Sequence, residues 1–250
     1  MQIHSFIRAL PLVLLILVAL SPAAIFAKDG DAVKDVSVLL FSSQKDPEGA
    51  TDSSTFLAPL ITAGAINVTQ GTGEADDRSK KITIDGAKVR KELSQEGIGK
   101  VTVRGRDSKK KESVQNGADL AVIGIAEAEN DANIKSITIT YDDVIVEYVA
   151  EGKLLWFFSH AYTETVTANL HPEVETKRVF VKLPWYRYFL KPSIPPANVE
   201  LKIEGDTTDA INLNSEKDIP LPFQQSSILL TMTSVLKLKE VVPDLPPADG

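Results

Sequence analysis

The carboxylates of Asp142 and Asp143 are the first residues in this chain whose types and spacing could do chemistry. With Glu147 close by, they could act as acid and base or hold calcium. Neighbouring residues of a strand point to opposite faces, so the pair could converge only at a bulge. We therefore favour a bulge or a solvated face, and keep a carboxylate-dependent enzyme as an alternative.

The histidines and the missing cysteines argue against a metal or cofactor site. His4 lies at the extreme N-terminus, and His160 and His171 are too few for a zinc site, which needs three or four convergent ligands. The chain has no cysteine, which excludes disulfides, thiolate ligands and a cysteine nucleophile. We predict no catalytic residue, no metal and no cofactor.

The strongest candidate site is the aromatic and basic segment Pro184–Lys191. Its aromatic and basic members are Trp185, Tyr186, Arg187, Tyr188, Phe189 and Lys191. Aromatic residues and arginine are enriched in interface hot spots and at membrane interfaces, which favours binding of a protein partner or a membrane. In a helical turn Arg187 and Lys191 would share one face, with Trp185 or Tyr188 as the anchor. The alternative is a hydrophobic plug between two regions of the chain.

Composition and charge restrict the class of protein. The chain of 250 residues is 43% hydrophobic and 24% charged, which is ordinary for a globular protein and argues against wholesale disorder. Its formal charge is −7, so it lacks the basic balance that binding to a phosphate backbone requires. We predict no nucleic-acid partner.

The N-terminus predicts export. Arg8 precedes the apolar run Ala9–Leu20, Pro22 interrupts the pattern, and small residues lead to Ala27. This layout is typical of a cleavable signal peptide, whereas a membrane anchor needs about 20 apolar residues. We expect a signal peptide at residues 1–27 and a periplasmic or outer-membrane-associated protein that is not lipidated, because it has no cysteine.

Residues 28–172 predict an α/β domain. The stretch Gly117–Glu129 is almost purely apolar in its middle and predicts a central strand covered on both faces. Asp35–Phe41 and Lys100–Arg104 predict further strands. Helices are expected after Ser53 or Ser54, after Asp85, and after Asp107. The alternation predicts a mixed sheet with flanking helices.

A long antiparallel hairpin is expected to close this domain. Ile134–Val149 alternates between apolar and polar residues, Ala150–Lys153 supplies a turn with glycine, and Leu154–Thr167 returns. We expect Trp156 to be buried where the return strand packs on a helix.

Residues 173–242 predict a smaller β-rich region. Val179–Leu183 predicts a short strand, Val199–Glu204 alternates cleanly, and Ser226–Val242 is the longest strand candidate. The last residues, 243–250, are rich in proline and predict a disordered tail.

Three features in this order carry a resemblance: VLLF ending an early strand, GADLAVIGIAE, and EGKLLW on the hairpin. Over about residues 34–168 the chain resembles the periplasmic domain shared by the TolB amino-terminal region, curli-secretion lipoproteins, flagellar outer-membrane accessory proteins and lipoprotein activators of penicillin-binding proteins. The matching positions are Asp119, Gly124, Gly152 and Trp156. The chain departs from the pattern at Glu151, where threonine is usual, and lacks the anchoring cysteine. The resemblance implies a mixed sheet with flanking helices and a scaffolding role.

These observations predict a non-enzymatic exported protein that acts in cell-envelope assembly or secretion through protein contacts. The alternatives are a secreted ligand- or glycan-binding module that uses residues 173–250, and the carboxylate-dependent enzyme.

Overall fold

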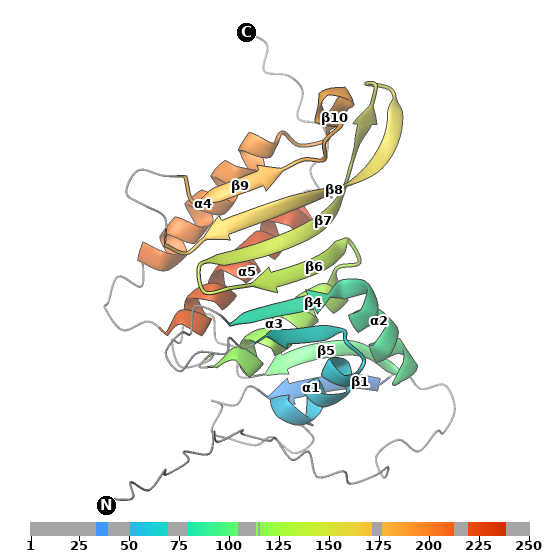
Figure 1. Cartoon of the computed structure of the whole chain (residues 1–250), viewed down its shortest axis with the longest axis vertical. Coiled ribbons are helices and arrows are strands. Elements are labelled where there is room, and N and C mark those ends of the chain that lie inside the picture. The colour runs from blue at the N-terminus through green and yellow to red at the C-terminus, as the bar shows by residue number, and fades with distance from the viewer. Residues whose placement is uncertain are drawn as a thin grey trace, which may run out of the picture. The chain divides into compact units, whose positions relative to one another are not determined.

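The computed structural model describes residues 34–39, 51–69, 80–104, 114, 116–171, 177–212 and 220–238. All of them lie in one unit, Ala32–Gly250, in which helices pack on two β-sheets (Figure 1). The predicted α/β class, with flanking helices and a long antiparallel hairpin, is confirmed. The expected signal peptide at residues 1–27 and the tail 243–250 lie outside the described residues. So does the helix expected after Asp107 up to residue 115, apart from Val114, which is not helical.

The larger sheet has seven strands, and every strand pair in it is antiparallel. Its main path runs β3-β4-β6-β7-β8-β9, and β10 lies off this path and pairs with β7. The strands are β3 (Ile66–Thr69), β4 (Lys81–Asp85), β6 (Ile134–Ile139), β7 (Asp143–Leu154), β8 (Phe158–Asn169), β9 (Val179–Lys182) and β10 (Leu190–Pro192). Burial alternates along β7 and β8, so one face packs on the core and the other is more open.

The smaller sheet is parallel and has the order β2-β1-β5. It consists of β1 (Lys34–Leu39), β2 (Thr51–Asp52) and β5 (Ile98–Arg104), so two of the predicted strands are confirmed. Parallel and antiparallel pairing are thus divided between two sheets rather than mixed in one.

Two helices begin where local signals predict them. Helix α1 (Ser53–Thr62) ends before Gly64, which has φ +66°. Helix α2 (Gly86–Gln95) is capped by Asp85, whose carboxylate accepts a hydrogen bond of 3.1 Å from the Lys88 amide. The Ser53 hydroxyl is buried without a hydrogen-bond partner among the described residues, so the cap predicted for α1 is not formed by Ser53. The cap at Asp85 and the turn at Gly64 are local signals, which is why the sequence alone predicts these helices.

The stretch Gly117–Glu129 was predicted as a central strand, and this prediction is wrong. It forms helix α3 (Gly117–Asn130), which is capped by Asn116: its side-chain oxygen accepts hydrogen bonds of 2.9 Å from the amides of Ala118 and Asp119. The helix is buried around most of its circumference because it packs on strands of both sheets and on α1, α2 and α5. A helix buried on all sides has no polar face, so its sequence lacks helical periodicity and can be mistaken for a buried strand.

A glycine lets α3 approach the larger sheet. A Cβ atom at Gly124 would lie 2.4 Å from Cδ1 of Ile84 on β4 and 3.8 Å from Leu229 on the C-terminal helix. A larger residue there would require the end of the Ile84 side chain to move. The apolar run therefore serves as the centre of the core, although as a helix.

The two main strand predictions for residues 173–242 are also wrong, while Val179–Leu183 is confirmed as β9. Val199–Glu204 lies in helix α4 (Pro196–Asn212), and most of Ser226–Val242 lies in helix α5 (Leu221–Leu238). In α4 the buried residues Val199, Ile203 and Thr207 are four apart, whereas Leu201 is exposed. The apparent alternation was therefore a coincidence of a helix with one buried stripe.

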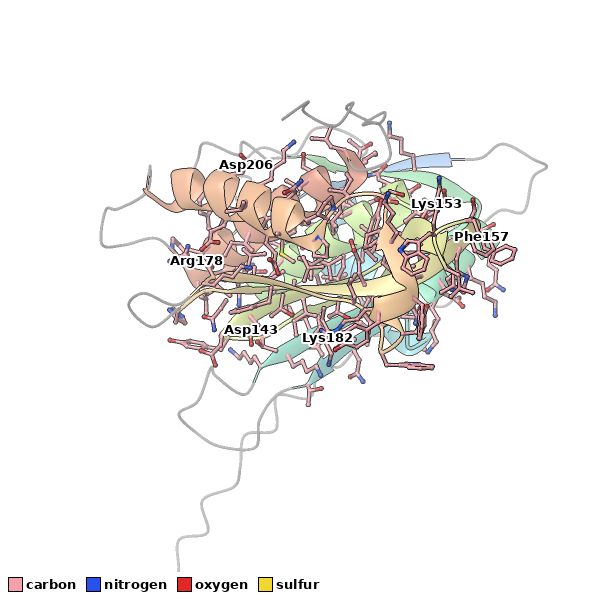
Figure 2. All side chains as sticks on the ribbon, turned by 90° about the horizontal axis from the view of Figure 1, so that it is seen from above. Asp143, Lys153, Phe157, Arg178, Lys182 and Asp206 are labelled. Carbon is pink, nitrogen blue, oxygen red and sulfur yellow. The ribbon has the colours of Figure 1, made fainter. Side chains whose placement is uncertain are left out.

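Helix α4 covers the outer edge of the larger sheet. Glu200 accepts a hydrogen bond of 2.7 Å from the Val181 amide and forms an ion pair with Lys177, and Glu204 accepts one of 3.2 Å from the Arg178 amide. These carboxylates satisfy amides that an edge strand would otherwise expose. Figure 2 shows Asp206 of α4 on one side of the strands and Lys182 of β9 on the other.

Candidate functional site

The segment Pro184–Lys191 lies at the surface, where a docking site has to be. Trp185 is 86% exposed and Tyr188 is 76% exposed. Tyr186 is half-buried and packs against the core. The alternative of a hydrophobic plug therefore fits Tyr186 alone among these three residues.

The backbone of this segment is not the regular helical turn that we predicted. Residues 185–186 form a turn, Arg187–Phe189 form a short 3₁₀ turn, and Leu190–Pro192 form β10. Lys191 thus lies on a strand and does not share a helical face with Arg187. Proline at both ends limits the segment, and β-pairing of its last three residues ends the helical geometry.

Strand β10 fastens this segment to the end of the β7–β8 hairpin. Leu190 pairs with Leu154, and Pro192 pairs with Gly152. The Leu155 amide also donates a hydrogen bond of 2.7 Å to the carbonyl of Phe189. A Cβ atom at Gly152 would lie 2.8 Å from the Lys191 carbonyl oxygen, so only glycine permits this approach.

The hairpin turn lies at residues 155–157 rather than at the predicted 150–153, because β7 continues to Leu154. Leu155 and Trp156 have φ values of 51° and 68°, and they are the two non-glycine residues with positive φ in the described part of the chain. The Phe157 amide donates a hydrogen bond of 3.4 Å to the Leu154 carbonyl. Positive φ at both central residues is the geometry of turns that favour Asn-Gly, so bulky residues here are strained.

Trp156 was predicted to be buried, and this prediction is wrong. It is 68% exposed at the turn. The physical reason is the shift of the turn: Gly152 was read as the turn glycine, whereas it serves the close approach of β10. The tryptophan that was expected on a packed strand therefore lies at the tip of the hairpin.

Together, the hairpin turn and the attached segment form a surface that we call the aromatic surface. It consists of the exposed residues Leu155, Trp156, Phe157, Phe158, Trp185, Tyr188 and Phe189. These are seven of the twelve large hydrophobic side chains that are exposed among the described residues, so exposure is concentrated here. Figure 1 shows β10 next to the ends of β7 and β8, and in Figure 2 Phe157 and Lys153 lie at the opposite end from Asp143. Contiguous exposed apolar patches mark interaction sites.

The charged side chains within the two segments that carry this surface are all basic, and the exposed Glu151 lies one residue outside them. In residues 152–160 and 184–193 they are Lys153, Arg187 and Lys191, with no aspartate or glutamate, although the chain as a whole carries −7. The Arg187 guanidinium lies 5.1 Å from the ring centroid of Tyr188 and donates a hydrogen bond of 3.3 Å to its hydroxyl. This hydrogen bond and the cationic charge lower the pKa of the Tyr188 hydroxyl.

Aromatic contacts hold the segment at the root of the surface. The ring of Tyr186 meets the ring of Trp185 edge to face at 5.5 Å and that of His160 at 5.8 Å. His160 Nε2 also lies 3.4 Å from the Tyr186 hydroxyl. Tyr186 and His160 therefore support the exposed rings, and this is the role that the structure gives to His160.

Asp142 lies in the turn between β6 and β7, and Asp143 is the first residue of β7, at the end of that strand opposite the aromatic surface. The Asp143 amide donates a hydrogen bond of 2.9 Å to the Thr140 hydroxyl, and the Asp142 carbonyl accepts one of 2.7 Å from Leu170. Burial and the charge of Asp142 raise the pKa of the Asp143 carboxyl. The hydrogen bonds show a turn-forming role for both residues. Among the residues that the structure places, no group of His, Asp and Glu could hold a metal ion.

Sequence reasoning found the segment 184–191 and missed the hairpin half of the surface. The signal was present in Leu154–Phe158, five consecutive large apolar residues in a hairpin, without a turn-forming residue among them. A strand with one solvent-exposed face has alternating apolar and polar residues. Five consecutive apolar residues are therefore not explained by packing of the sheet. The hairpin turn and the segment 184–191 lie side by side only because β10 pairs with β7.

Comparison of the chain with protein families, with curated proteins and with solved structures found no match. No helix in the described part is long and apolar enough to cross a membrane.

Proposed function

We propose that this chain is a non-enzymatic, exported protein that acts in assembly of the cell envelope by docking on another envelope component through the aromatic surface. The observation that carries the proposal is the gathering of seven exposed apolar side chains from two segments about thirty residues apart, Leu155–Phe158 and Trp185–Phe189. The leader-like sequence at residues 1–27 supports export to the periplasm or the outer membrane.

The energetics suit a docking role. Burial of one large apolar side chain contributes about 1.5–3 kcal/mol. Association costs about 4–15 kcal/mol in lost freedom. Seven side chains are enough to offset that cost, whereas a single exposed ring such as Phe180 on β9 is not.

The strain at the turn supports the same proposal. Residues held in sparsely populated backbone regions cost about 1–3 kcal/mol each and concentrate at functional sites. Leu155 and Trp156 both have positive φ and both expose their side chains. Their side chains gain nothing for the fold that would offset this cost, so their value lies in a contact outside the chain.

The resemblance to periplasmic assembly domains supports the envelope role only in part. Gly152 and Trp156 lie in the hairpin, as the resemblance implies. Asp119 and Gly124 lie on helix α3, where the resemblance implies a strand. The proposal therefore depends on the aromatic surface rather than on the resemblance.

Sedimentation with washed envelope membranes tests the proposal. We expect the wild-type chain to sediment with them, and the Phe157→Ser and Tyr188→Ser variants to remain in the supernatant. Phe180→Ser is the matched control, because Phe180 is 48% exposed on the same sheet but outside the aromatic surface. All four proteins should have the same melting temperature. Equal sedimentation of all four proteins would contradict the proposal.

A further inference from the structure

We infer that the aromatic surface docks on the interfacial region of a lipid bilayer that contains anionic lipids. This inference rests on the proposed function and names what the surface contacts. In this view Trp156, Phe157 and Phe158 enter the boundary between headgroups and acyl chains, Trp185 and Tyr188 lie at headgroup level, and the basic residues contact lipid phosphates.

The types of side chain fit a bilayer interface. Tryptophan and tyrosine are enriched where membranes meet water, because each has an apolar ring and a polar group. Both tryptophans of the chain, Trp156 and Trp185, lie on this surface. Peripheral anchors combine such rings with phenylalanine or leucine on the inserted side. The hairpin turn supplies that side with Leu155, Phe157 and Phe158.

The form of the surface also favours a bilayer over a protein groove. Its residues lie in two adjacent turns and at the start of β8, and Figure 1 shows this end of the hairpin extending past the end of α4. A protein partner would need a pocket that fits two projecting turns. Lipid chains rearrange around any projection, so a bilayer needs no complementary shape.

Part of the backbone at the tip and in the attached segment is already hydrogen-bonded within the chain. The Leu155 amide bonds to the Phe189 carbonyl at 2.7 Å, and the Phe157 amide bonds to the Leu154 carbonyl at 3.4 Å. In the attached segment the Arg187 amide bonds to Pro184 and the Phe189 amide to Tyr186, both at 3.0 Å. Backbone groups that already have partners can leave water at little cost.

The distribution of charge selects anionic lipid. A chain with a formal charge of −7 is repelled by an anionic membrane unless its contacting end is basic. Lys153, Arg187 and Lys191 are exposed beside the rings, and they outnumber the one adjoining acidic residue, the exposed Glu151. Each basic residue near such a surface strengthens binding about fivefold, so three of them orient the molecule with this end toward the lipid.

The test uses protein-free vesicles and the two tryptophans as reporters. The protein is purified from cells that export it and mixed with vesicles of phosphatidylcholine alone or of phosphatidylcholine with phosphatidylglycerol. We expect flotation with the anionic vesicles, a blue shift of tryptophan emission, and quenching by brominated acyl chains. Binding to neutral vesicles should be weaker. Trp185→Phe leaves only Trp156 as the reporter, and its emission should show the deeper insertion.

Matched variants separate the rings from the charges. Phe157→Ser should lower the vesicle affinity at least tenfold in either lipid, since burial of a large apolar side chain is lost. The triple variant Lys153→Gln, Arg187→Gln, Lys191→Gln should lose about a hundredfold, but only on anionic vesicles. Phe180→Ser should bind like the wild type. Every variant carries the same N-terminal segment, so differences among them report this surface alone.

The outcomes distinguish this inference from the proposed function. Sedimentation with envelope membranes but not with protein-free vesicles would mean that the partner is a protein, which overturns the lipid inference and leaves the proposed function standing. Binding to neither would overturn both. Equal vesicle binding by Phe157→Ser, Phe180→Ser and the wild type would also overturn the lipid inference.

Discussion

The two turns at the ends of β7 solve the same geometrical problem with opposite chemistry. The β6–β7 turn, Thr140–Asp142, is closed by hydrogen bonds to Asp143 and to neighbouring elements. Its Thr140 hydroxyl accepts from the Asp143 amide at 2.9 Å, and its Thr140 carbonyl accepts from the Gln225 side chain of α5 at 2.7 Å. None of its residues has a positive φ. This turn is built for stability.

The β7–β8 turn has apolar residues where hairpins favour Asn-Gly. Leu155 and Trp156 occupy the left-handed region, and their side chains face solvent. The left-handed backbone disfavours large L-residues at these positions. Exposure to water gives their apolar side chains no stabilisation in the free chain. The fold of this chain therefore does not explain the sequence of the second turn, and this supports the proposal that the turn contacts another molecule.

The largest effect is expected when the second turn is given the residues that its backbone favours. Leu155→Asn with Trp156→Gly should lower membrane or envelope binding about a hundredfold, because two apolar side chains are lost. The same change should raise the free energy of unfolding by about 1–2 kcal/mol, because strain at positive φ is relieved. Urea titration and vesicle flotation measure the two effects.

The β6–β7 turn supplies the control for that exchange. Tyr141→Asn with Asp142→Gly should leave binding unchanged and should not stabilise the chain, since neither position has positive φ. If both exchanges changed binding equally, the contrast between the two turns would have no functional meaning.

The next effect concerns the junction that brings the two halves of the aromatic surface together. Gly152→Ala would place its methyl carbon 2.8 Å from the Lys191 carbonyl oxygen, which is too close. We expect a loss of about 1–3 kcal/mol in unfolding free energy, and weaker binding because β10 is displaced. Gly205→Ala is the control, since nothing lies within 4 Å of its Cβ position. A stable Gly152→Ala variant with full binding would disprove the role of this junction.

A smaller effect is expected at the β6–β7 turn. Thr140→Ala removes the hydroxyl that accepts from the Asp143 amide and should cost about 1 kcal/mol in unfolding free energy, without any change in binding. Thr138→Ala on β6 controls for the change of residue type. A loss of binding in Thr140→Ala would mean that the two ends of β7 are coupled.

The smallest effect concerns Asp143. Burial and the charge of Asp142 raise its pKa above the ordinary 3.8, so the folded chain holds this proton more tightly than the unfolded chain. The contribution of this carboxyl to the unfolding free energy therefore increases as the pH falls through the folded pKa. It reaches its full value below pH 3.8. Asp143→Asn should raise the melting temperature slightly at neutral pH, and the difference from wild type should shrink in acid. Binding should be unaffected. Loss of biological activity in a folded Asp142→Asn, Asp143→Asn variant would revive the enzyme alternative.

The sequence by itself determined the elements whose signals are local. Asp85 caps α2 through an amide three residues away, and Gly64 ends α1 because its backbone needs positive φ. The alternation in β7 and β8 predicted a hairpin because one face of these strands packs on helices and the other is open. In each case the deciding interaction lies within a few residues or follows the period of the strand.

Tertiary structure alone decided the identity of α3 and α4. An apolar run such as Leu120–Ala126 is compatible with a buried strand or a buried helix, and only contact with both sheets makes burial on all sides favourable for a helix. In α4 the pattern at Val199, Leu201 and Ile203 fits a strand as well as a helix, and packing on β9 buries only the first and last of the three.

The aromatic surface was determined partly by the sequence and partly by the tertiary structure. The sequence identified Trp185 and Tyr188 as an unusual concentration of aromatic residues, but it placed Trp156 in the core. The position of Trp156 depends on where the hairpin turns. The β7–β8 pairing continues past Gly152 to Leu154, and Gly152 serves the approach of β10. Residues thirty positions apart become one surface through the pairing of β10 with β7, and a pairing between distant segments leaves no local signal in either of them.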